Sequence, residues 1–278
     1  MGAVDDPRAA FAAELEKPEP EIDLARAALL IAAEEYAGLD VDNYVARIDD
    51  IADGVRPRLS GDEGPASVLA AINGHLYGAL GFQGNREEYY DPRNSFLNEV
   101  IERRTGLPIL LCILYREVAR RLGHGLVGIN FPLHFVLAWP LPDGPLIVDA
   151  FENGAILTPA QCELRLARSY GRPISLGPEA YEPVGARMIV RRVLNNLLNE
   201  YVRQSDHARA LAVVERMLLT LPIPEDLRTR GLLLFRLGKH RAAEESLANF
   251  LANAPDAGDR EEIEQHLKWI RRLRASVN

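Results

Sequence analysis

The sequence contains little cysteine and very little lysine. Two cysteines, Cys112 and Cys162, cannot build a disulfide framework or a four-cysteine zinc site, and the histidines are not spaced as metal ligands. None of the three lysines lies in an apolar stretch that would lower its pKa, which argues against covalent catalysis by lysine. We therefore expect no metal and no other cofactor. The low cysteine content is typical of a reducing cytoplasm.

Missing features also argue against membrane insertion and nucleic-acid binding. No segment reaches the roughly 18 uncharged apolar residues that a membrane span needs, and residues 1–21 lack the basic region of a secretory signal. The net charge of −8 is opposite in sign to the basic footprint of a nucleic-acid binder. With 47% apolar and 26% charged residues, the composition is that of a folded globular protein.

Four segments of the chain differ in their patterning. Residues 1–20 carry prolines among acidic residues and predict a loose N-terminal arm. Residues 21–80 place apolar residues at helical spacing and predict a helical region. Residues 81–184 mix turns, one long apolar helix and short β-rich runs, whereas residues 185–278 are helical in pattern.

The third segment predicts a buried helix packed on a small antiparallel sheet. Pro108 suits the first position of a helix that runs to Leu122, and the first half of this helix is apolar on all sides. Three β-rich runs follow, joined by short turns, at 126–131, 134–139 and 146–151. The sequence therefore predicts a mostly helical α+β fold.

The last segment carries a weak repeat. Ala210 and Pro222 recur 33 residues later as Ala243 and Pro255, and a closing helix follows at 260–274. This spacing is similar to the tetratricopeptide pattern, whose unit is about 34 residues. A plain antiparallel helical bundle is the alternative.

One ordered set of residues points to chemistry. A buried helix, then a strand near His134, then a strand near Asp149 is the order of a Cys–His–Asp site on a papain-like core. In such a site the thiol lies at the start of the helix, where the helix dipole and the imidazolium lower its pKa. We expect His134 and Asp149 to lie on adjacent antiparallel strands and to face that helix end.

Several motifs around this set resemble a known family. The chain is similar to the transglutaminase-like superfamily and, within it, to the bacterial family of SirB type, which carries a helical N-terminal region and tetratricopeptide-like repeats at its C-terminal end. The resemblance rests on Asn94-Ser95-Phe96-Leu97-Asn98, Arg104-Thr105-Gly106-Leu107-Pro108, Phe131-Pro132-Leu133-His134-Phe135 and Asp149-Ala150-Phe151. It implies a papain/transglutaminase-like core. In the superfamily this helix opens with Gly-x-Cys, and here Pro108 occupies the position of the nucleophile.

Cys112 is the candidate replacement for the missing thiol. It follows Pro108 by four residues and so shares that helix face, but it lies about 6 Å further along the axis. Its neighbours are apolar, and an apolar setting raises the pKa of a thiol and makes it inert, which favours a core cysteine. Cys162 has no role in the family and is expected to be structural.

Three further residues are candidates for substrate binding. Asn94 and Asn98 precede the core helix and could instead hold the loop or cap the helix. Tyr90, like its neighbour Tyr89, lies in a loop rich in turn residues, where it could line a groove or anchor the loop.

Three hypotheses of function follow. The first, favoured by Pro108, is a non-catalytic, protein-binding or regulatory scaffold whose partner binds the core cleft and residues 187–257. The second is a cysteine hydrolase or acyl transferase that uses Cys112, His134 and Asp149. The third is a ligand sensor built on the His134 pocket.

Overall fold

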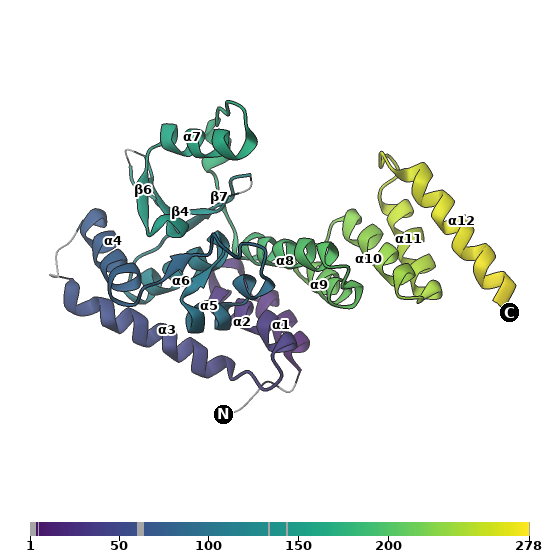
Figure 1. The fold of residues 1–278 in the computed structure, drawn as a ribbon, viewed down its shortest axis with the longest axis horizontal. Helices are drawn as coiled ribbons and strands as arrows, with labels where there is room; N and C mark the ends of the chain where they lie inside the picture. The colour runs from purple at the N-terminus through teal and green to yellow at the C-terminus, as the bar shows by residue number, and fades with distance from the viewer. Residues whose placement is uncertain (1–3, 5, 60–63, 133, 143, 278) are drawn as a thin grey trace. The chain divides into compact units, whose positions relative to one another are not determined.

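The computed structural model describes residues 4, 6–59, 64–132, 134–142 and 144–277. Leu133, which belongs to one of the sequence motifs, and residues 1–3 and 5 of the expected arm lie outside the described residues. The chain divides into two compact units, Met1–Val193 and Leu194–Asn278, and each unit is described by itself (Figure 1).

The first unit begins with helices that the sequence predicted only in part. Helices α2 (Leu24–Glu35), α3 (Val41–Val55) and α4 (Pro65–Asn73) fill the expected helical region. The expectation of a loose arm is wrong for its described part, because α1 (Pro7–Glu16) packs on α2. Asp6 caps α1, and the side chains of Phe11 and Leu15 are buried. The Asp-Pro start favours helix initiation here, and the two apolar residues, four apart, anchor the helix.

The segment after α4 leads into the core through short elements. A two-residue strand β1 (Gln83–Gly84) pairs in parallel with β2 (Thr105–Gly106), and α5 (Leu97–Arg103) lies between them in the chain. The ring of Phe151 packs so closely on Gly84 that a Cβ there would lie 2.5 Å from the ring. A larger residue at this close approach would therefore force the Phe151 ring to move.

The long buried helix is α6 (Pro108–Arg121), as predicted. All residues from Pro108 to Tyr115 are buried. Gly123, with a φ of +88°, follows the end of the helix in the left-handed conformation that glycine adopts without strain. The buried Glu117 carboxylate is paired with Arg116, Arg120 and Arg121, so the charge is neutralised.

The sheet has five strands rather than the three expected. Its order is β6-β5-β4-β3-β7 and every pair is antiparallel. The strands are β3 (Val127–Ile129), β4 (Val136–Trp139), β5 (Leu146–Asp149), β6 (Ala155–Leu157) and β7 (Pro183–Val184). β6 and β7 were missed because two or three residues are too few to show the alternation that marks a strand.

Helices cover both faces of this sheet. Val136 and Ala138 of β4 pack with Cys162 and Leu166 of α7 (Pro159–Tyr170). Side chains alternate along a strand, so Leu137 faces the opposite side, where α6 contacts β4. Figure 1 shows α7 and α6 on opposite sides of β4. The core helix and α7 are thereby fixed to the same strand.

Five helices complete the chain. They are α8 (Ala186–Arg203), α9 (His207–Thr220), α10 (Pro224–Arg236), α11 (His240–Asn253) and α12 (Arg260–Val277). The division between the units falls within α8, nine residues after the expected boundary. Ala210 and Ala243 are fully buried, and a Cβ at Gly231 would lie 2.5 Å from the Leu247 side chain. Small residues therefore permit close helix packing in the second unit.

Candidate functional site

His134 and Asp149 form a hydrogen-bonded pair. The Nε2 atom of His134 lies 2.9 Å from Oδ2 of Asp149, whose side chain is fully buried. An ionised carboxylate only accepts, so with Asp149 ionised the imidazole donates from Nε2. Asp149 ends β5, whereas His134 lies in the turn two residues before β4. The two residues meet as expected, but only Asp149 is on a strand.

The Asp149 carboxylate is shared among four donors. Its Oδ1 atom accepts from the backbone N–H groups of Phe151 and Glu152, at 3.1 and 3.3 Å. Its Oδ2 atom accepts from His134 and also from Nη1 of Arg165, at 2.6 Å. Arg165 comes from α7 and was not among the sequence candidates. Its guanidinium pairs with the same carboxylate oxygen that His134 contacts.

An open cleft of about 500 Å³ lies beside the pair. It collects residues from the loop before η4 (Pro92–Ser95), the start of α6, the turn before β4, η5 (Ala150–Glu152) after β5, and α7. The lining residues are Arg86, Tyr89, Pro108, His134, Phe151, Glu152, Arg165, Leu166 and Arg168. Pro108 thus stands at the cleft in the first turn of α6, with neither a thiol nor a backbone N–H to offer.

Cys112 is not one of the residues that line the cleft. Its side chain is fully buried, and its Sγ atom donates a weak hydrogen bond to the Phe135 carbonyl at 3.5 Å. Burial, with a smaller contribution from the Asp149 charge, raises the pKa of this thiol well above its ordinary value. A thiol in this setting is protonated at neutral pH and is a poor nucleophile.

Two segments of the sequence match models of known protein families. Residues 42–195 match the model of the transglutaminase-like superfamily. The chain belongs to this superfamily. Residues 197–268 match a tetratricopeptide-repeat model, which assigns the second unit to this repeat class.

Relatives of this transglutaminase-like chain come from bacteria and from animals. A UPF0162 protein of Xylella fastidiosa (strain 9a5c) is 36% identical over 250 residues, which cover 88% of this chain and 89% of that protein. A UPF0162 protein of Vibrio cholerae serotype O1 is 31% identical over 184 residues, covering 65% and 67%. F-box only protein 21 of Mus musculus is 37% identical over 142 residues, covering 48% of this chain and 22% of that protein.

The other candidates of the transglutaminase-like unit lie away from the cleft. Asn94 is fully buried and holds its own loop, since it accepts from the Asn85 amide and donates to the Glu88 carbonyl. Asn98 is also buried, and Tyr90 is 66% exposed. These three do not line the cleft, whereas Tyr89 does, with its ring edge-on to that of Phe151.

Cys162 is buried between α7 and the sheet, in agreement with the expected structural role. Burial raises the pKa of its thiol to about 11. Among the described residues, no group of three or more His, Cys, Asp or Glu side chains could hold a metal ion. Within the same part of the chain, no helix is both long and apolar enough to cross a membrane.

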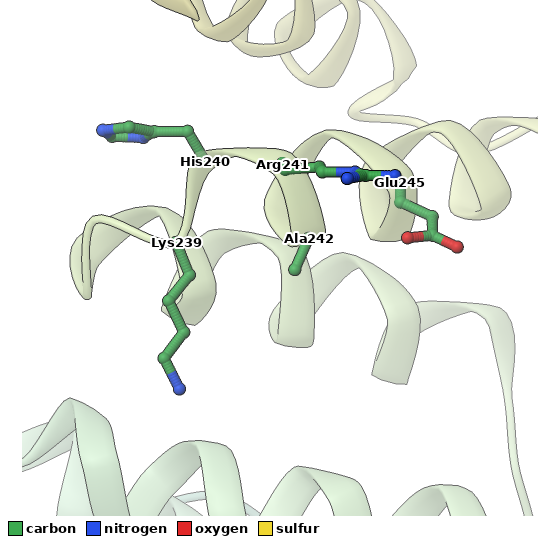
Figure 2. A pocket seen from close by; sticks show the side chains of 5 residues that line it. All are labelled: Lys239, His240, Arg241, Ala242 and Glu245. Atoms are coloured by element: carbon green, nitrogen blue, oxygen red, sulfur yellow. The ribbon is translucent and has the colours of Figure 1, made fainter.

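Hollows are also present among the described residues of the tetratricopeptide unit. One, of about 520 Å³, lies at the start of α11, but Figure 2 shows that the side chains of Lys239 and His240 point in different directions. Another is a groove of about 450 Å³ to which α8, α9, α10 and α12 contribute. This tail groove is lined by Val202, Ser205, His207, Arg228, Thr229, Leu232, Leu233, Arg236, Asp259, Glu262 and Ile263.

Proposed function

We propose that this chain is a non-catalytic, protein-binding scaffold of the transglutaminase-like superfamily. The observation that carries the proposal is Pro108, which stands at the cleft in the first turn of α6. By the resemblance of the sequence motifs, this is the position where the superfamily's helix carries its thiol. Arg165 adds support, because it binds the same Asp149 oxygen as His134. Without a reactive thiol beside it, the His134–Asp149 pair has no nucleophile to activate.

The tail groove supports the binding half of the proposal. Helical repeats bind extended peptide segments on concave surfaces built from neighbouring helices. The groove combines apolar side chains such as Leu232 and Ile263 with charged side chains of both signs. Both cysteines are free and buried, which is consistent with a protein that works in the reducing cytoplasm.

A matched pair of charge reversals tests the groove. Arg236→Glu changes an exposed residue of the tail groove, whereas Arg241→Glu changes an exposed residue one helix further on, outside it. We expect affinity capture from a bacterial lysate, quantified by mass spectrometry, to lose specific partners with Arg236→Glu and to retain them with Arg241→Glu. Equal recovery with wild type and both variants would contradict a binding role for the groove.

A further inference from the structure

We infer that the core cleft binds a carboxylate group carried by a short acidic peptide segment with an apolar or aromatic side chain beside it. This inference rests on the proposed function, since it assigns the cleft to binding rather than to turnover. It concerns the chemical class of the ligand, which neither the family nor the repeat match specifies.

The cationic side chains of the cleft come from two directions. Arg165 and Arg168 lie one turn apart on α7, and Arg86 comes from the loop after β1. Arg165 is held by Asp149, and the Arg86 guanidinium lies over the Phe151 ring, 5.0 Å from its centroid. Guanidinium groups that are already fixed lose little freedom on binding, and their planar forks match a carboxylate.

The charge balance leaves positive charge available at the cleft. The Glu152 carboxylate pairs with Arg86, and its Oε1 atom also lies 3.7 Å from Nη1 of Arg165. The Asp149 carboxylate contacts Arg165 and His134. Arg168 is exposed and makes no ion pair within the part of the chain that the structure describes. Its guanidinium can therefore bind an incoming carboxylate without breaking an existing pair.

The remaining lining favours a peptide over a free inorganic anion. Tyr89, Pro108, Phe151 and Leu166 form apolar surface next to the arginines. The cavity of about 500 Å³ falls in the range of ordinary ligand pockets, which fits a few residues of a peptide. Phosphate alone would leave the apolar surface uncovered, whereas an aromatic or aliphatic side chain would bury it.

Three labelled peptides test the inference on the full chain. One is Gly-Ala-Phe-Glu-Ala-amide with an N-terminal BODIPY label, which carries no carboxylate and no net charge. The second has Gln in place of Glu, and the third is the Gln peptide with a free C-terminal carboxylate. We expect fluorescence anisotropy to give at least about tenfold tighter binding for a carboxylate peptide than for the uncharged one. The ratio of the two carboxylate peptides distinguishes a side-chain from a terminal source.

Two exposed arginines provide the variant and its control. Arg168→Gln removes a cleft charge, and Arg172→Gln removes a charge just beyond the end of α7. We expect Arg168→Gln to weaken the carboxylate peptides about fivefold and to leave the uncharged peptide unchanged, because the lost bond is charge-assisted. Arg172→Gln should match wild type.

Several outcomes would overturn the inference. Equal affinity for the charged and uncharged peptides, equal weakening by both variants, or displacement by inorganic phosphate without preference among the peptides would each do so. Turnover of the Gln peptide that Cys112→Ser abolishes would instead overturn the proposed function. The two failures are therefore distinguishable in one set of measurements.

Discussion

Asp149 joins three parts of the core through one carboxylate: the turn before β4, the end of β5 and α7. It is fully buried, and each of its oxygens accepts two hydrogen bonds. A buried carboxylate is costly unless it is paired and hydrogen-bonded, and here both conditions hold. At the residue scale, Asp149 is therefore as important for the shape of the cleft as for the position of His134.

Cys112 provides the sharpest prediction at this scale. Because burial raises the pKa of its thiol, we expect iodoacetamide to label Cys112 of the folded protein very slowly near pH 7. Labelling should become fast only in denaturant, as peptide mapping by mass spectrometry would show. Cys162, also buried, serves as the internal reference. Fast labelling of folded protein that His134→Ala abolishes would favour the cysteine enzyme instead.

At the scale of secondary-structure elements, hydrogen bonds of Arg187 connect the N-terminal segment to α8. The Arg187 side chain donates to the carbonyls of Leu15 and Lys17, at distances from 2.6 to 3.0 Å, and to the Glu19 carboxylate at 3.0 Å. Glu19 in turn accepts from the Ala186 N–H at 2.6 Å. One arginine thus fixes the C-terminal end of α1 to the start of α8.

Removal of the Arg187 side chain should weaken the contact between the end of α1 and the start of α8. We expect Arg187→Ala to lower the free energy of unfolding by about 1–3 kcal/mol, because several hydrogen bonds to a charged group are lost together. Urea denaturation followed by circular dichroism measures the change. The control is Arg56→Ala, whose ion pair with Asp53 and bond to the Arg121 carbonyl are both exposed and are expected to contribute at most about 1 kcal/mol. Equal effects of both substitutions would contradict the structural role of Arg187.

Elements with strong local signals were predictable from the sequence, and those that depend on distant packing were not. Helix α6 and the order of His134 and Asp149 follow from apolar runs and turns that a single sequence displays. Arg165 could not be placed, because its approach to Asp149 depends on how α7 packs across the sheet. Tyr89 and Tyr90 are adjacent in one loop, so the sequence alone could not say which of them lines the cleft.

At the scale of the whole molecule, a core with a cleft is joined to a short helical array. Such an array depends on close contacts between neighbouring repeats, because each unit cannot bury its apolar face alone. Ala243 of α11 is fully buried, whereas the adjacent Ala242 is partly exposed and borders the shallow pocket in Figure 2. These neighbours therefore form a natural pair of positions for testing the array.

Ala243→Leu should destabilise residues 194–278 selectively. Overpacking a buried position costs about 1–3 kcal/mol, so we expect faster hydrogen exchange in these residues, a lower melting temperature and weaker partner capture. Exchange in residues 1–193 should change little, and Ala242→Leu should resemble wild type. If Ala243→Leu loosens the tail and capture is unchanged, the partner binds the core rather than the repeats.

The close packing of Gly84 on Phe151 has a consequence for how this family can diversify. Phe151 lines the cleft, whereas Gly84 packs against its ring and is not one of the lining residues. Any larger residue at position 84 would force the Phe151 ring to shift and so change this wall of the cleft, because a Cβ there would lie 2.5 Å from ring atoms. Evolution could thus alter the size of the acceptable ligand by changing a residue that the ligand never touches, while the chemistry of the lining stays the same.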